Sequence, residues 1–409
     1  MPAPFPRLAV DGGTPIRNEP LPPWPHFDAD EVEAVVSVLR SGRVNYWTGR
    51  EGVAFEDEFA SYVRRRHAIA LANGTLALEL ALRVYGIGAG DDVIVPARTF
   101  IATASAAVAV GARPVVADVD ALSGVLTPAS IEQALTPATR AVIPVHLGGW
   151  PCDMDPIMSL AEHHDLVVIE DCAQALGACY KGRPVGSLGH AAAFSFCQDK
   201  IMTTGGEGGA LALDDSTLWE AAWSYKDHGK SYSATRGSAP SSGVAFKWTH
   251  DSFGTNWRMS EMQAAVGRLA LPKVDGWVQT RRSHAAVLDE AVRSAAGLLV
   301  LEPGSDLYHA YYKYYAAVEP QHLREGWNRD RIAEAIIAEG IPCFSGSCPE
   351  IYLEKAFMDR GWGPAERLAN ARMLGERSLM FLVHPTLGAQ DAADAAAAIE
   401  KVMAQAGVS

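Results

Sequence analysis

Short apolar runs alternate with stretches of helical periodicity between about residues 67 and 215. Continuous Val, Ile and Ala runs spaced by helices are typical of a mostly parallel sheet that is covered on both faces. Segments 75–86 and 155–165 show the helical spacing. Seven runs indicate strands: 67–72, 92–96, 113–119, 140–145, 166–170, 192–196 and 209–213. We therefore predict an α/β fold whose ligands bind beyond the carboxyl ends of the strands.

The pattern changes after about residue 270. A long helical stretch (272–296) is followed by the aromatic run 308–318, which alternates like a strand, and by helical regions near 329–339 and 389–406. This combination of helical and strand-like segments predicts a smaller α/β domain. The proline-rich segment EPLPPWPHF indicates an extended arm, because consecutive prolines disfavour helix. We divide the chain into an arm (1–30), a large domain (31–270) and a small C-terminal domain (271–409).

Composition narrows the class of protein. The chain has 409 residues with a net charge of −13, which argues against nucleic acid or an anionic membrane as a partner. No window approaches about 18 apolar residues, and the first residues lack the pattern of a secretory signal. The six cysteines are scattered without a C-x-x-C pair, so we expect free thiols in a reducing compartment and no metal site. The predicted location is the cytoplasm.

An anion site is one of two interpretations of NGT at 73–75, which follows a strand and opens a helix. Backbone N–H groups at a helix start favour an anion, whereas Asn or Thr there is also an ordinary helix cap. Ser195, at the end of a strand, can donate a hydroxyl to the same anion or simply be a polar strand end. No P-loop motif occurs, and GIGAGDD (86–92) precedes a strand, so it is a turn and not a dinucleotide loop.

An acid and a lysine complete the candidate chemistry. Asp171 ends an apolar strand, where it forms a helix cap, an internal salt bridge or a ligand contact. Lys200 stands before the glycine cluster TTGGEGG, in a turn where a surface lysine is the ordinary alternative. A phosphate nest, a strand-end acid and a lysine amine have one joint explanation, pyridoxal phosphate (PLP). The glycines let the backbone pass close to such a cofactor.

Six segments resemble the DegT/DnrJ/EryC1/StrS aminotransferases, PLP-dependent transferases of fold type I that aminate keto-sugars. They are NGTLALELAL, VIVPARTFIATASA, IPVHLGGWPCDMDPI, VIEDCAQALGACYKGRPVGSLG, FSFCQDKIMTTGGEGGAL and GTNWRMSEMQAAVG, in this order. The resemblance covers nearly the whole chain. It implies a large domain built on a mostly parallel seven-stranded sheet, together with a smaller C-terminal α/β domain.

The resemblance also implies roles for single residues. Lys200 bonds covalently to the cofactor, and Asp171 pairs with the pyridinium nitrogen so that the ring stays an electron sink. Phe100 stacks on the ring, and Gln174 contacts the region of the ring hydroxyl. These four residues are expected in one cavity.

The cofactor phosphate and the partner subunit follow from the same resemblance. Gly74, Thr75 and Ser195 are expected to hold the phosphate, although many family members have SGT where this chain has NGT. Asn256 is expected to reach the phosphate bound by a neighbouring subunit, which implies a homodimer with shared sites.

The implied activity is amino transfer from L-glutamate or L-glutamine to a nucleotide-linked keto-sugar in polysaccharide or antibiotic sugar biosynthesis. Relatives with histidine at the position of Lys200 act as dehydratases, so the lysine favours amino transfer. The run TTGGEGG resembles inosose aminotransferases and 3-amino-5-hydroxybenzoate synthases, which leaves amino transfer or dehydration of a free ring as an alternative. A non-enzymatic binding protein is the third possibility, against which the intact Lys200 and Asp171 speak.

Substrate contacts are predicted from position alone. The candidates are Tyr46, Trp47, Arg258 and His309, with His146, His228 and the segment 344–352 near the site. Each has a structural alternative: core packing for the aromatic residues, an interface salt bridge for Arg258, and a satisfied buried imidazole for His309.

Overall fold

The computed structural model describes residues 7–236 and 248–408, and a seven-stranded sheet is its centre. Strand β9 alone runs against the others. In sheet order the strands are β1 (His67–Leu71), β9 (Gly209–Leu213), β8 (Ala191–Ser195), β5 (Val167–Asp171), β4 (Thr139–Val142), β2 (Asp92–Pro96) and β3 (Arg113–Ala117). All seven predicted strands and the mostly parallel sheet are confirmed.

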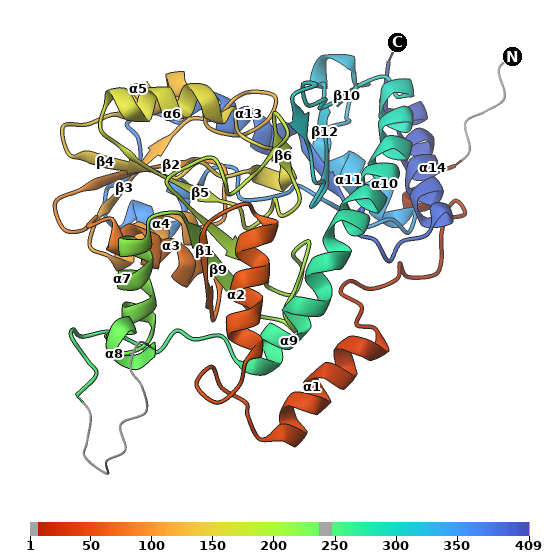
Figure 1. The fold of residues 1–409 in the computed structure, drawn as a ribbon. Helices are drawn as coiled ribbons and strands as arrows, with labels where there is room; N and C mark the ends of the chain where they lie inside the picture. Colours follow the sequence, from red (N-terminus) through yellow and green to blue (C-terminus); the bar gives the residue numbers. More distant parts are fainter. Residues whose placement is uncertain (1–6, 237–247, 409) are drawn as a thin grey trace, which may run out of the picture.

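Both faces of this sheet are buried, which explains the continuous apolar runs. Along β1, Ala68 and Ala70 join the apolar cluster on one face, whereas Ile69 and Leu71 join the cluster on the other. Figure 1 shows the two helical layers on either side of the strands. One layer contains α2 (Glu51–Tyr62), α5 (Pro128–Ala134) and α6 (Met154–His163); the other contains α3 (Gly74–Val84), α4 (Ala102–Ala109) and α7 (Ser216–Lys226).

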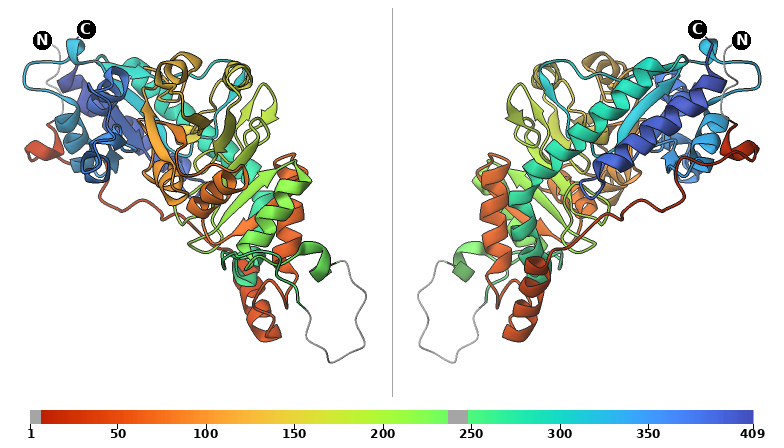
Figure 2. Two further views of the ribbon diagram at one scale, coloured as in Figure 1. Left: turned by 90° about the vertical axis from the view of Figure 1, so that its left-hand side faces the viewer. Right: turned by 90° about the vertical axis from the view of Figure 1, so that its right-hand side faces the viewer.

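A four-stranded antiparallel sheet forms the centre of the C-terminal region. Its order is β10 (Leu298–Val300), β12 (Tyr314–Val318), β14 (Ser378–Phe381) and β13 (Cys343–Phe344). Helices α10 (Val274–Ser294), α11 (Arg329–Ala338) and α14 (Ala389–Ala406) contribute to its apolar cluster. The long α10 runs from the large sheet to this region and lies beside α14 (Figure 2).

The prediction of one continuous strand over residues 308–318 is wrong. The run is divided between β11 (Leu307–Tyr308), which pairs with β6 (Cys179–Tyr180), and β12. A third strand, β7 (Arg183–Pro184), completes that small sheet. Between β11 and β12 the chain bends at Tyr311, whose φ of 47° is left-handed and incompatible with a continuous strand.

The N-terminal segment joins distant parts of the chain. After η1 (Ala9–Asp11), residues 12–28 form no helix or strand until α1 (Ala29–Ser41), which packs against α9 (Glu261–Ala270). Arg17 pairs with Asp391 of α14 at 2.6 Å, and the indole Nε1–H of Trp24 donates to the carbonyl oxygen of Lys200 at 2.9 Å. In Figure 2 this extended arm runs from the C-terminal region to α1.

Part of the C-terminal sequence returns to the large sheet. Ile351, Phe357 and Leu374 belong to the apolar cluster that also contains α3 and α4. They lie on η5 (Ile351–Leu353), α12 (Lys355–Met358) and α13 (Ala369–Arg377). The predicted domain limits stay a prediction, because this segment connects the two bodies.

The remaining described elements are η2 (Leu147–Gly149), α8 (Tyr232–Arg236), η3 (Leu271–Lys273) and η4 (Pro320–His322). Within residues 7–236 and 248–408, no helix combines the length and the apolar character needed to cross a membrane.

Candidate active site

A cavity of about 720 Å³ opens beyond the carboxyl ends of the central strands. Asp171 ends β5 and Ser195 ends β8, while Phe100 lies in the loop after β2. The opposite wall comes from the C-terminal region and includes Tyr312, Lys313, Tyr315, Phe344, Ser347 and Met380. The cavity thus lies between the two sheets, at the place where parallel α/β sheets bind ligands.

The start of α3 forms one end of the cavity. The side chain of Asn73 accepts a hydrogen bond from the N–H of Leu76 at 3.0 Å, so Asn73 is a helix cap. Gly74 and Thr75 open the helix and line the cavity together with Ser195. A helix start offers N–H groups without intrahelical partners, so capping and anion binding are compatible here. The arrangement fits a phosphate.

Asp171 provides a buried carboxylate. One oxygen accepts a hydrogen bond from the hydroxyl of Thr103 at 2.9 Å, and the other accepts from the N–H of Ala173 at 3.1 Å. Burial raises the pKa of Asp171 above its ordinary value, although these hydrogen bonds and the charge of Lys200 oppose the rise. A buried carboxylate of this kind is stabilised by a cationic ligand such as a pyridinium N–H.

Lys200 is held by its backbone while its side chain reaches into the cavity. Its N–H donates to the carbonyl of Cys197 at 3.1 Å, and its own carbonyl accepts from Trp24. The ammonium Nζ lies 4.0 Å from the Asp199 carboxylate and 4.9 Å from the ring centroid of Tyr312. The side chain is only 17% exposed. The amine is therefore placed inside a walled site, unlike a surface lysine.

Phe100 and Gln174 line the space between these groups. Phe100 is 66% exposed, which is unusual for a phenyl ring and leaves its surface available to a planar ligand. The Gln174 side-chain oxygen accepts the N–H of Gly148 at 2.7 Å, so its amide NH₂ is the group left for a ligand.

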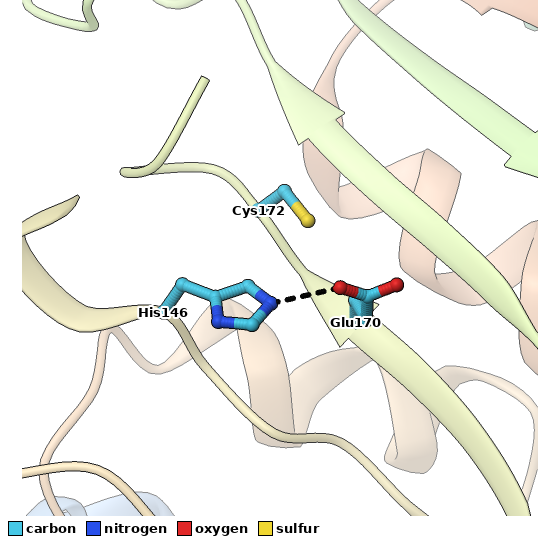
Figure 3. A group of neighbouring side chains, drawn as sticks. All are labelled: His146, Glu170 and Cys172. Atoms are coloured by element: carbon cyan, nitrogen blue, oxygen red, sulfur yellow. Dashed lines mark hydrogen bonds and ion pairs between the residues drawn. The ribbon is translucent and has the colours of Figure 1, made fainter. Parts of the chain in front are cut away.

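Glu170 and His146 form a support behind Asp171. Glu170 is on the opposite face of β5, and its carboxylate accepts from His146 Nε2 at 3.0 Å (Figure 3). His146 Nδ1 accepts the N–H of Cys152 at 2.9 Å, so the proton is on Nε2. The backbone N–H of His146 also donates to the carbonyl of Asp171 at 3.1 Å. These bonds fix the end of β5 and hence the position of Asp171.

Cys172 lies beside this pair, and the three side chains resemble a metal-binding set (Figure 3). The donor chemistry does not fit a metal. The Glu170 oxygens already accept three backbone N–H groups at 2.7–2.8 Å, from Gly186, Leu188 and Gly189. Burial raises the pKa of Glu170, but the bonds from His146 and these N–H groups outweigh it and lower the pKa. The cluster is a saturated hydrogen-bond network.

Five predicted residues lie outside the lining of this cavity: Tyr46, Trp47, Asn256, Arg258 and His309. The hydroxyl of Tyr46 donates to Glu56 at 2.9 Å within the core, and the Trp47 ring lies 3.9 Å below the ammonium of Lys230. Neither ring faces the cavity within the same chain. Their substrate roles stay predictions.

Asn256 and Arg258 are on a segment that runs beside the end of β1. Arg258 pairs with Asp227 at 2.5 Å, whereas Asn256 is exposed. In the same region, the backbone N–H of His228 donates to the carbonyl oxygen of Thr255 at 2.8 Å. An exposed Asn256 is available to a second subunit.

His309 is buried next to Trp150 in a neighbouring small cavity. Its Nδ1 accepts the N–H of Tyr311 at 2.7 Å, and burial lowers its pKa to about 3. This environment keeps the imidazole neutral.

Sequence reasoning missed the wall formed by Tyr312 and Lys313. Tyr312 donates its hydroxyl to Asp199, and its ring lies beneath Lys200. The available signal is a lysine within an aromatic run, but the alternation of that run favours an uninterrupted strand.

The fold and the site together define a PLP-dependent transferase of fold type I. The sequence model of the DegT/DnrJ/EryC1/StrS aminotransferase family matches residues 25–400. The chain belongs to this family; it is an aminotransferase, and its cofactor is PLP.

Three similar proteins illustrate the range of the family. The L-glutamine:2-deoxy-scyllo-inosose aminotransferase of Streptomyces kanamyceticus is 38% identical over 349 residues, which cover 84% of this chain and 81% of that protein. The dTDP-3-amino-3,4,6-trideoxy-alpha-D-glucose transaminase of Streptomyces venezuelae is 35% identical over 360 residues, which cover 88% of each. The X-ray structure of an aminotransferase from Psychrobacter cryohalolentis is 52% identical, with a TM-score of 0.92, and the match covers 94% of this chain and 99% of that one.

Proposed function

We propose that the chain transfers the amine of L-glutamate or L-glutamine to the ketone of a sugar, carried on a nucleotide, in polysaccharide or antibiotic sugar biosynthesis. The observation that carries amino transfer is that Lys200, Asp171 and the start of α3 line one cavity. A similar dTDP-sugar transaminase supports the sugar acceptor.

The chain's own residues divide the work of the reaction. Bound PLP supplies an electron sink that stabilises negative charge at the carbon next to the amine. Asp171 would keep a proton on the ring nitrogen, and Phe100 would cover one face of the ring. Lys200 Nζ takes the proton from the α-carbon of the donor and returns one to the acceptor carbon. The N–H groups of Gly74 and Thr75, with the hydroxyl of Ser195, hold the phosphate.

A free cyclitol ketone is the second candidate acceptor. The similar protein from Streptomyces kanamyceticus is named for an inosose substrate, and this supports a six-membered ring without a nucleotide. Dehydration of an aminoshikimate-type ring stays a further alternative at the same site.

A substrate panel tests these candidates. The purified holoenzyme would be loaded with amine from L-glutamine, and nucleotide-linked keto-sugars, inososes and cyclohexanone acids would be added separately. Amine gain by one class, detected by mass spectrometry, identifies the acceptor, whereas water loss identifies a dehydratase. Absence of any spectral change with both donors would refute amino transfer.

We also propose a homodimer in which Asn256 contacts the phosphate in the neighbouring subunit. Phe253 is 100% exposed in the same segment, which supports an interface there. In a hybrid of Lys200→Ala and Asn256→Ala chains, one site would retain both native residues. Activity restored in the hybrid supports the exchange, whereas no restoration places Asn256 in its own chain's site or away from any site.

The cytoplasm stays our proposed location, and nucleic acid and membranes stay excluded by prediction. All six cysteines are free, which supports a reducing compartment.

A further inference from the structure

A second lysine lines the cofactor cavity. Lys313 precedes β12, and its ammonium Nζ lies 4.8 Å from the ring centroid of Tyr312. The ammonium of Lys200 lies 4.9 Å from the same centroid. The two nitrogens are therefore at most about 10 Å apart, and both side chains line the same cavity.

Lys313 lacks an ion-pair partner within the part of the chain that the structure describes. The nearby Asp199 is engaged by the hydroxyl of Tyr312 and lies beside Lys200. A third cation, the fully buried Arg281, donates to the carbonyl of Tyr312 at 3.1 Å. This wall of the cavity is positive, and a half-buried ammonium without a counter-ion is costly unless a ligand supplies the anion.

The expected position of the cofactor phosphate is on a different wall of the cavity from Lys313. The phosphate site formed by Gly74, Thr75 and Ser195 is on the large sheet, whereas Lys313 belongs to the opposite, C-terminal wall. The donor's amine must reach the position of Lys200 Nζ, and its α-carboxylate is attached to the same carbon as that amine. The carboxylate is also the only anionic group that L-glutamate and L-glutamine share.

We propose that Lys313 binds the α-carboxylate of the amino donor and so makes the enzyme selective for α-amino acids over simple amines. This inference depends on the proposed function, because it requires an amino acid donor. The interaction is a charge-assisted hydrogen bond, whose removal typically weakens binding about 10- to 100-fold.

The test uses the holoenzyme and its donor reaction without an acceptor. The spectral change of the bound cofactor is titrated with L-glutamine in the wild type, Lys313→Gln and Lys313→Arg. We expect Lys313→Gln to require about 10- to 100-fold more L-glutamine for half-conversion, and Lys313→Arg to remain within about threefold, because it keeps the charge. Lys181→Gln is the matched control, since Lys181 is a surface lysine paired with Asp155.

A second probe removes the carboxylate from the donor instead. 4-Aminobutanamide is L-glutamine without its α-carboxylate, so the wild type and Lys313→Gln should react with it equally. The two proteins and the two donors form a double-mutant cycle, which measures whether the effect of Lys313 requires the α-carboxylate of the donor. Circular dichroism of each variant checks that it is folded, and the Lys313→Arg variant tests the charge if the glutamine variant is unstable.

Three outcomes would overturn the proposal. The first is an unchanged L-glutamine requirement in folded Lys313→Gln. The second is an equal loss with 4-aminobutanamide, which would indicate a general disturbance of the cavity. The third is an increase confined to the acceptor KM, which would place an anionic group of the acceptor at Lys313. A wild-type enzyme that reacts with no amino acid would refute the proposed function itself.

Discussion

Gly74→Ala tests whether the start of α3 must approach β8 closely. A Cβ added to Gly74 would lie 2.7 Å from Ser195 Cβ and 3.0 Å from the carbonyl oxygen of Phe194. Carbon atoms in contact are normally at least about 3.5 Å apart. The helix start would have to move away from β8, and with it the N–H groups that are expected to hold the phosphate.

The expected change in the free energy of unfolding of Gly74→Ala follows from two opposing effects. Replacing glycine by alanine at a compatible site stabilises a protein by about 0.4–1 kcal/mol. Inserting a methyl group into a close contact costs about 1–3 kcal/mol. We expect a net loss of about 1–2 kcal/mol in the free energy of unfolding. We also expect at least tenfold weaker PLP binding, because a shift of the donors that costs about 1.4 kcal/mol changes the affinity tenfold.

Gly276→Ala is the matched control. Gly276 is inside α10, and an added Cβ would meet no atom within 4 Å. This variant should be stabilised by about 0.4–1 kcal/mol and should bind PLP normally. Urea unfolding of the cofactor-free proteins and spectroscopic PLP titration measure both quantities. Equal unfolding midpoints and equal PLP affinities for the two variants would refute the close-approach reasoning.

Four further predictions address single side chains. Lys200→Ala should abolish the visible absorption of lysine-bound PLP and reduce amino transfer at least about 100-fold; full turnover would contradict the assignment. Glu170→Gln should lower the free energy of unfolding by about 1–3 kcal/mol, because three backbone N–H groups lose a charged acceptor; an unchanged urea midpoint would show that the network is dispensable. Burial lowers the pKa of Lys313 to about 8, so raising the pH past 8 should increase the L-glutamine requirement of the wild type and leave Lys313→Arg unaffected. Burial lowers the pKa of His309 to about 3, whereas an unfolded histidine titrates near 6.5. Its contribution to stability is therefore complete above about pH 6.5 and is lost as the pH falls toward 3, because only the unfolded chain binds the proton. Urea midpoints at pH 7 and pH 4 should differ less in His309→Gln than in the wild type.

The large sheet and the cofactor residues were predictable because their signals are local. A strand that is buried on both faces must be apolar throughout, so each strand is recognisable in the sequence as an apolar run. Asp171 and Ser195 are the last residues of two neighbouring parallel strands, and parallel strand ends meet at one edge. Lys200 is five residues after Ser195, so the topology brings it to the same edge of the sheet.

The opposite wall was not predictable in this way. The direction of Lys313 depends on the bend at Tyr311, whose left-handed φ has no signature in an alternating aromatic run. The return of Ile351 and Leu374 to the large sheet, and the bond from Trp24 to Lys200, join residues far apart in sequence. Neither hydrophobic periodicity nor a short motif records such contacts.

The bond between Trp24 and Lys200 has a mechanical consequence. Arg17 pairs with Asp391 of α14, and Trp24 donates a hydrogen bond to the backbone of Lys200. Trp24 also contacts Trp277 of α10 and His384, so its indole connects the backbone of Lys200 to the C-terminal elements. A change in the length of the arm between Arg17 and Trp24 is therefore expected to displace the indole and, with it, the backbone of Lys200.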